Sequence, residues 1–138
     1  MTLDADLVRV RCAEIAESLE RLARIRAAGR EAFLADADAR DIACYRLLLA
    51  IEAALSLCYH VSARRLNQVP EDYAGCFAGL ATHGLISAEL SDRLQRMARF
   101  RNLLVHMYWR IHFHRVFNLL ENDVDDLRAF SSAMAGLL

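Results

Sequence analysis

The sequence predicts an all-α protein, a bundle of about five helices in which two long helices lie antiparallel. Its 138 residues include only 5 glycines and 1 proline, the residues that most often interrupt helices. Hydrophobic residues make up 56% of the chain. They recur at steps of three and four, the spacing that places apolar side chains on one face of a helix. We expect residues 1–138 to form a single helical domain, since one core typically takes about 100–200 residues.

The two long helices are expected over residues 3–28 and 38–66. Gly29 is a natural stop for the first helix. The loop before the second helix contains Asp36 and Asp38, and either carboxylate can cap a helix N-terminus. The apolar stripes of the two helices are Val8, Cys12, Ile15, Leu19, Leu22 and Ile25, then Cys44, Leu48, Ile51, Leu55, Cys58 and Ser62.

Three shorter helices complete the predicted bundle. The third helix fits Glu71–Ala81, with Gly84 as its terminator. The fourth runs over Ala88–His106, and the Ser87 hydroxyl is placed to cap it. After a short break, the fifth covers Phe113–Leu137.

The charged residues limit the chemistry that the chain can perform. All 17 basic residues are arginine, against 18 acidic residues, for a formal net charge of -1. Without lysine, neither a Walker-A phosphate site nor Schiff-base catalysis is possible. A net charge near zero also argues against a broad polybasic surface for nucleic acids.

The cysteines and the apolar runs indicate a cytoplasmic protein. None of the four cysteines has a second cysteine three positions away, and each lies among apolar neighbours. We expect all four to be free, buried thiols in a reducing compartment, rather than disulfide or metal ligands. The apolar runs fall short of the roughly 20 residues that a membrane span needs, so no membrane association is expected.

One segment stands apart, because polar side chains gather there among apolar residues. Arg101, Asn102, His106 and Tyr108 lie within eight positions. At about 100° per residue, Asn102 and His106 share a helix face, whereas Arg101 and His106 point about 140° apart. The latter two can line one groove if the helix end distorts, or if a second subunit supplies the complement. The spacing favours the second possibility, a composite site at a two-fold dimer interface.

These residue types suit phosphodiester cleavage without a metal ion. Histidine can move protons near neutral pH, and arginine offers a permanent charge in a geometry that matches phosphate. With the RNA 2′-hydroxyl as internal nucleophile, His106 would serve as general base or acid, and Arg101 would stabilise the transition state. The structural alternative is that Arg101 and Asn102 cap a helix end while His106 and Tyr108 are hydrogen-bonded core or interface groups.

The segment FRNLLVHMYWRI (Phe100–Ile111) resembles the Arg-x4-His-x-Tyr motif of HepT-like toxins, a family of the HEPN superfamily (higher eukaryotes and prokaryotes nucleotide-binding domains). The similarity extends to AIEAALSLCYHV (Ala50–Val61), to VPEDYAGCFAGLATHGLIS (Val69–Ser87) and to VFNLLENDVDDLRAF (Val116–Phe130). It covers about two-thirds of the chain, from roughly Arg46 onwards.

The resemblance implies an all-α homodimer whose motifs meet at the dimer interface and act as a metal-independent endoribonuclease. It also implies a partner, the antitoxin MntA, a minimal nucleotidyltransferase that uses ATP to AMPylate the motif tyrosine. Carried onto this chain, Arg101 and His106 are the catalytic pair, Asn102 is the auxiliary polar residue and Tyr108 is the AMPylation target. No cofactor of the chain's own is implied.

Two positions depart from the family pattern, and one other reading of the function stays open. Family members often carry an aspartate where this chain has Ser56, and an Ile-Asp pair where it has Ile111-His112. The alternative function is a non-catalytic HEPN domain that binds a nucleotide or regulates a nucleotidyltransferase. A plain dimeric bundle, in which Arg101 and His106 are structural, is the third possibility.

Further polar residues near the motif allow two interpretations each. Along the motif helix and just past it, the arginines form either a solvated helix face or a positive rim that guides RNA phosphates; they are Arg93, Arg96, Arg99, Arg101 and Arg110. His112 and His114 suggest a metal site only weakly, because no cysteine or acid nearby completes it. We expect core or interface positions for three tyrosines, and either a core or a groove position for Trp109; the tyrosines are Tyr45, Tyr59 and Tyr73.

Overall fold

The computed structural model describes residues 2–138, and this part of the chain is helical throughout, without a β-strand. The elements are α1 (Ala5–Ala27), α2 (Arg30–Ala35), α3 (Ala37–Arg65), α4 (Tyr73–Thr82), α5 (Ala88–His106), the 3-10 helix η1 (Tyr108–Arg110), α6 (Phe113–Asn122) and α7 (Val124–Ala135). The predicted all-α class is confirmed.

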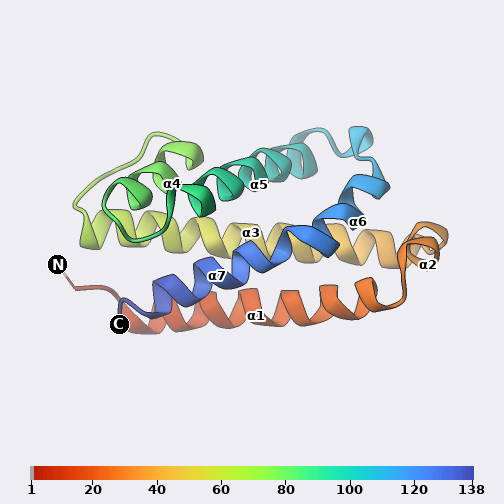
Figure 1. Ribbon diagram of the computed structural model, residues 1–138, viewed down its shortest axis with the longest axis horizontal. Helices are drawn as coiled ribbons and strands as arrows, with labels where there is room; N and C mark the ends of the chain where they lie inside the picture. The colour runs from red at the N-terminus through yellow and green to blue at the C-terminus, as the bar shows by residue number, and fades with distance from the viewer. Residues whose placement is uncertain (1) are drawn as a thin grey trace.

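The two long helices, α1 and α3, lie antiparallel and form the base of the bundle (Figure 1). The α7 helix packs against both of them, while α4 and α5 cover the other side of α3. At one end, α2 and α6 close the bundle beside η1. Both chain termini lie at the opposite end. The motif helix α5 is therefore supported along its length by the longest helix of the fold.

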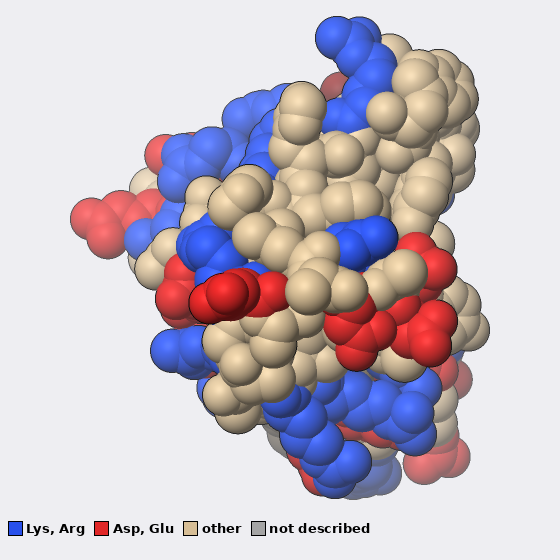
Figure 2. Space-filling model, turned by 90° about the vertical axis from the view of Figure 1, so that its right-hand side faces the viewer, with Lys and Arg blue, Asp and Glu red and all other residues tan. Residues whose placement is uncertain are grey.

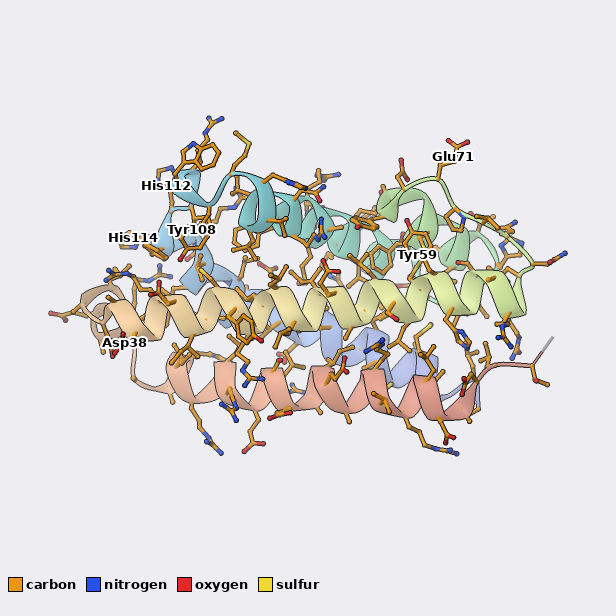
Figure 3. All side chains as sticks on the ribbon, turned by 180° about the vertical axis from the view of Figure 1, so that it is seen from behind. Asp38, Tyr59, Glu71, Tyr108, His112 and His114 are labelled. Carbon is orange, nitrogen blue, oxygen red and sulfur yellow. A yellow bond between two sulfur atoms is a disulfide. The ribbon has the colours of Figure 1, made fainter. Side chains whose placement is uncertain are left out.

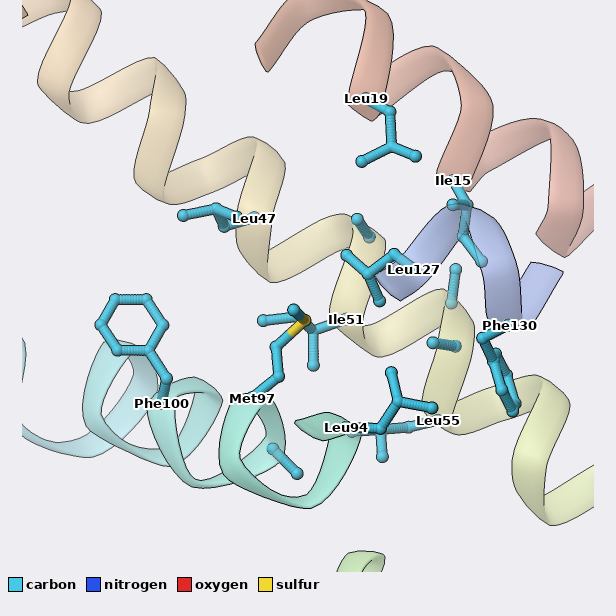
Figure 4. Packing of buried hydrophobic residues seen from close by; sticks show 14 of the residues in the cluster. Ile15, Leu19, Leu47, Ile51, Leu55, Leu94, Met97, Phe100, Leu127 and Phe130 are labelled. Atoms are coloured by element: carbon cyan, nitrogen blue, oxygen red, sulfur yellow. The ribbon is translucent and has the colours of Figure 1, made fainter. Parts of the chain in front are cut away.

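The core is built from the apolar stripes that the sequence predicts. Ile15 and Leu19 of α1 belong to one cluster with side chains of α3, α5 and α7 in the middle of the bundle (Figure 4). In α7, Phe130 is fully buried, and its ring stands edge-on to Phe77 at 5.4 Å between centroids. Such burial is the main stabilising contribution to the fold.

Side-chain caps mark the starts of four helices, which are α1, α3, α4 and α5. The Asp36 carboxylate accepts hydrogen bonds from the amides of Asp38 and Ala39, so Asp36 rather than Asp38 caps α3. The Ser87 hydroxyl caps α5 as predicted, at 3.1 Å from the Leu90 amide. The third predicted helix starts two residues late, at Tyr73, because Asp72 is its N-cap and not part of its first turn.

Two predicted segments have a different course. The loop expected after the first helix contains the short helix α2, with Phe33 buried beneath it. The helix expected over Phe113–Leu137 is divided at Asp123 into α6 and α7. Asn122 and Asp123 are poor helix formers, and the break lets α7 turn to lie along α1.

The expectation of four free thiols is wrong for two of the cysteines. Cys58 of α3 and Cys76 of α4 form a disulfide, with their Cα atoms 6.2 Å apart. Cys12 and Cys44 are free. The pairing could not be inferred from spacing, because the two cysteines are 18 residues apart and meet only when α4 folds back on α3.

By length and composition alone, α3 is long and apolar enough to cross a membrane, which the short uncharged runs in the sequence do not suggest. Of its most apolar window, 56% is buried inside the bundle. Its apolar side chains are thus the centre of the core, as in the central helix of a soluble bundle.

Candidate functional site

The motif segment lies on the last two turns of α5 and on η1. The α5 helix is capped by Ser87 and remains α-helical as far as His106. Met107 then leaves the helical conformation, with φ -139° and ψ 44°. Tyr108 therefore does not continue the α5 helix but starts a separate turn, from which its side chain reaches Asp41 of α3.

Arg101 points inward and is held on three sides. Its Nε donates to the Glu52 carboxylate of α3, and its Nη1 donates to the Asn102 side chain at 3.0 Å. The guanidinium also lies 5.4 Å from the centroid of the Tyr73 ring, at the start of α4. Only 16% of the Arg101 side chain is exposed. The charge that would meet a phosphate is thus fixed in place before any ligand arrives.

His106 lies on the other side of the helix, exposed to solvent. It lines an open hollow of about 450 Å³ together with Asn102, Leu103 and Met107, and Arg99 stands at the same hollow. Asn102 connects the two halves of the motif, because it bonds to Arg101 and also lines the hollow of His106. It does not cap a helix end, contrary to the structural alternative.

The geometry excludes one of the two arrangements in which Arg101 and His106 are expected to line one groove. Since α5 is undistorted up to His106, the helix end does not bring Arg101 and His106 together. Among residues 2–138, no hydrogen bond joins their side chains. Of the two expected arrangements, the composite site at a dimer interface stays a prediction.

Tyr108 packs over α3 at the end of the bundle that carries α2 and α6 (Figure 3). Its hydroxyl donates to the Asp41 carboxylate at 3.2 Å, and the ring lines a hollow with Cys44, Tyr45 and Leu48. Partial burial raises the pKa of the Tyr108 hydroxyl, and the neighbouring Cys44 and Asp41 add to the rise. Tyr108 is 46% exposed, and its hydroxyl is protonated at neutral pH.

Three of the predicted rim arginines, Arg96, Arg99 and Arg110, are exposed. Within residues 2–138, none of these three forms an ion pair with a carboxylate. By contrast, Arg21 and Arg24 of α1 pair with glutamates of their own helix. The end of the bundle shown in Figure 2 carries acidic and basic groups side by side rather than one basic field.

The remaining candidate residues lie in separate environments. In the part of the chain that the structure describes, no three His, Cys, Asp or Glu side chains are grouped as metal ligands. His114 is instead engaged by Arg30, whose Nη1 donates to the His114 carbonyl at 3.0 Å. Trp109 is 78% exposed, which places it outside the core. Ser56 accepts a hydrogen bond from Arg11 Nε at 3.0 Å.

The three tyrosines expected at core or interface positions are not fully buried. Tyr45 is 57% exposed, and the rings of Tyr59 and Tyr73 stack edge-on at 5.9 Å over the α3–α4 contact. Burial raises the pKa of the Tyr59 hydroxyl, and the nearby Tyr73 and Asp72 add to it. Tyr73 thereby gains a role that was not expected, as the ring beneath Arg101.

Two acidic residues of α3 contact the motif, and the sequence alone does not predict them as site residues. Glu52 and Asp41 hold Arg101 and Tyr108 respectively. They are eleven positions apart, or about 16 Å along the helix, so the arginine and the tyrosine mark two separate points on one helix. The available signal was a carboxylate inside an apolar stretch, AIEAAL, where a charged group requires a partner.

An all-helical bundle that presents an Arg-x4-His-x-Tyr segment at the end of a supported helix defines the HEPN class of proteins. The family model described as "Ribonuclease HepT-like" matches residues 15–134. The chain belongs to this family.

The relatives agree with this assignment. The chain is 25% identical over 125 residues to the mRNA nuclease HepT of Shewanella oneidensis, covering 91% of this chain and 93% of that protein. It superimposes with a TM-score of 0.88 on a tri-AMPylated HEPN toxin of the same species, solved in complex with its MNT antitoxin, at 24% identity and 99% coverage of both chains. A toxin–antitoxin structure with AMP-PNP gives a TM-score of 0.85 at 23% identity, covering 97% of this chain and 99% of that one.

Proposed function

We propose that the chain is the toxin of a toxin–antitoxin pair, a metal-independent endoribonuclease that acts as a homodimer in the cytoplasm. The observation that carries the proposal is that Arg101 and His106, two side chains of α5, have different environments. Arg101 is mostly buried and held by Glu52, while His106 is exposed at an open hollow on the same helix. A fixed cation and an accessible acid–base group are the two functions that RNA cleavage without a metal needs.

The reaction follows from the residue types. An imidazole nitrogen of His106 takes the proton of an RNA 2′-hydroxyl, and the oxygen attacks the adjacent phosphorus. The bond from phosphorus to the 5′-oxygen breaks, and that oxygen takes up a proton from water. The products are a 2′,3′-cyclic phosphate and a free 5′-hydroxyl. Arg101, with Asn102 as its auxiliary, stabilises the added negative charge on the phosphorane.

The dimer is part of this mechanism. Arg101 and His106 of one protomer diverge by about 140° around α5, so one protomer does not offer both groups to one phosphate. A two-fold axis beside α5 places the arginine of one copy near the histidine of the other. Val105, which is 43% exposed between the two motif residues, supplies apolar surface for such a contact.

The partner that we propose is a MntA-type nucleotidyltransferase antitoxin, which silences the chain by AMPylating Tyr108. The Tyr108 oxygen would attack the α-phosphorus of ATP, and pyrophosphate would leave; the Asp41 carboxylate, 3.2 Å away, is placed to receive the phenolic proton. ATP belongs to the antitoxin, and the toxin needs no cofactor of its own. A bulky anion here would obstruct and repel the RNA backbone on its way to Arg101.

The first experiment compares RNA cleavage and growth inhibition by the wild-type dimer, Arg101→Ala and His106→Ala. We expect both substitutions to reduce cleavage by at least a hundredfold. Arg65→Gln is the matched control, because Arg65 is exposed at the far end of α3 and forms no ion pair within residues 2–138. Unchanged cleavage in both variants, or no cleavage by wild type, contradicts the nuclease and favours a non-catalytic nucleotide-binding partner.

The second experiment tests the modification. After co-expression with the nucleotidyltransferase antitoxin, the intact mass of the wild-type chain should rise by one or more AMP units. Tyr108→Phe should gain none, and Tyr45→Phe, which alters the neighbouring exposed tyrosine, should gain as many as wild type. AMP addition to Tyr108→Phe would place the acceptor elsewhere.

A further inference from the structure

The groove between α5 and α6 contains a second concentration of arginines, outside the motif. It is a hollow of about 180 Å³, and three of its lining side chains are Arg93, Arg96 and Arg115. We propose that it is a phosphate-binding subsite that holds the RNA strand away from the scissile bond. The inference rests on the proposed function, to which it adds the path of the substrate.

The guanidinium groups of this hollow are available to a ligand. Within residues 2–138, neither Arg96 nor Arg115 pairs with a carboxylate. Arg115 is held over the Phe100 ring, 5.4 Å from its centroid, which fixes the plane of its guanidinium. Arg93 binds Asp126 through Nε at 3.0 Å, and its two terminal nitrogens form no hydrogen bond with another described residue. Planar guanidiniums with free nitrogens match phosphate oxygens.

The acidic groups nearby do not cancel this charge. Asp126 is matched by Arg93, which leaves Asp123 as the carboxylate on the wall of the hollow. Burial and the neighbouring Asp126 raise the pKa of Asp123, against the opposing effect of Arg96 and Arg93. The hollow therefore has a net positive charge, because its three arginines outnumber the lining carboxylate of Asp123 and the paired carboxylate of Asp126.

The hollow is placed to receive a phosphate other than the one that is cleaved. Arg96 lies ten residues before His106 on α5, which corresponds to about 15 Å along the helix axis. Arg99 stands between them and lines the hollow of His106, so exposed arginines lead from one hollow to the other. A strand that enters the His106 hollow can therefore continue along α5 towards α6.

Recognition in this subsite would be through the backbone alone. The cationic groups of the lining are guanidiniums, which contact phosphate irrespective of the base, and the side-chain oxygen of the lining amide Asn118 already accepts a hydrogen bond from Arg30. The subsite is therefore expected to increase affinity for any single-stranded RNA long enough to span both hollows. It would also make binding more dependent on salt, by roughly 0.7 in the log–log slope for each phosphate contact.

The test measures binding rather than cleavage. A His106→Ala dimer is titrated against a fluorescent, unstructured 12-nucleotide RNA over a range of salt concentrations. Adding Arg96→Gln and Arg115→Gln should weaken binding about tenfold at low salt and flatten the salt slope by about 1. Adding Asp123→Asn should strengthen binding, because it removes the lining carboxylate. Adding Arg65→Gln is the control, and circular dichroism and dimer mass establish that every variant is folded.

The outcomes separate this inference from the nuclease proposal. If the double arginine variant binds as tightly as the Arg65→Gln control, with the same salt slope, the subsite is refuted. It is also refuted if the parent His106→Ala dimer binds no RNA. If the double variant loses affinity but the wild-type protein cleaves no RNA, the subsite stands and the nuclease fails.

Discussion

The guanidinium of Arg101 is positioned by side chains from two other helices. Glu52 receives its Nε hydrogen, and the Tyr73 ring lies beneath it. A buried or partly buried arginine without a partner is costly, so the ion pair both permits the burial and sets the direction of the side chain. Glu52 is accordingly a positioning residue, since it touches Arg101 and not the RNA in the proposed reaction.

We expect Glu52→Gln to reduce kcat about tenfold without raising KM for RNA. The neutral amide holds Arg101 less firmly, and small displacements of a catalytic group reduce rate strongly. Removing a negative charge does not weaken RNA binding, so KM stays equal or falls. Glu52→Asp should restore part of kcat. Steady-state kinetics with a labelled RNA give both parameters, and a parallel loss of dimer or melting temperature would indicate a purely structural role.

Asp123 gives a prediction about stability and pH. Its folded pKa is raised, so its charged form is less favourable in the folded state than in the unfolded state. Stability is therefore greatest below the unfolded pKa and is lost as pH rises through the folded pKa. Asp123→Asn should increase the free energy of unfolding at pH 7 by less than about 1 kcal/mol, since the side chain is only partly buried.

The control for this substitution is the same measurement at a lower pH. Urea denaturation at pH 7 should show the gain, and at pH 3, where the wild-type carboxyl is protonated in both states, the two proteins should be equally stable. A gain that persists undiminished at pH 3 would refute the electrostatic origin. Asp125→Asn, at an exposed position of the same turn, serves as a matched variant.

The sequence predicts which residues of the motif carry the chemistry, but not which residues support them. Arg101, Asn102, His106 and Tyr108 are recognisable because they interrupt an apolar run and share a family spacing. Glu52 and Asp41 lie far from them in the chain. Their partners are set by the way α5 lies along α3, which local periodicity does not specify.

At the scale of elements, the N-cap of α5 contributes to the stability of the helix that carries the motif. The Ser87 hydroxyl satisfies the Leu90 amide, and loss of such a cap typically costs about 1 kcal/mol. We expect Ser87→Ala to lower the free energy of unfolding by about that amount, and Ser87→Asp to retain most of it. Thermal or urea unfolding measures the change. Ser132→Ala, on an exposed face of α7, should have an effect within about 0.5 kcal/mol.

Helix starts were easier to predict than helix continuity. Caps such as Ser87 and Asp36 are local chemistry, and both are found where the sequence placed them. The division at Asp123 carries no glycine or proline; its local signal is only the two poor helix formers Asn122 and Asp123, and the α7 helix beyond it packs on α1. Dependence on packing explains why the Cys58–Cys76 pairing was missed.

At the scale of the whole molecule, one continuous core joins all the helices that hold the motif in place. Phe130 is fully buried between α7 and α4, against Phe77. Phe130→Ala should lower the free energy of unfolding by about 3–5 kcal/mol, because it removes a large buried ring and leaves a cavity. Chemical denaturation of the dimer measures this loss. Val69→Ala, at a side chain that is 89% exposed, should change the stability little.

The two chain ends lie together, far from the motif. Thr2 and Leu3 line the same hollow as Leu137 and Leu138, at the end of the bundle opposite to η1 (Figure 1). The N-terminus and the C-terminus of the bundle are therefore close together in space. A short linker across this gap would permit circular permutation, with new ends in the loop at residues 66–72, where Cys58 and Cys76 bridge the opening. Such a chain would keep residues 88–110 unbroken while reversing the order in which the two halves of the bundle are synthesised.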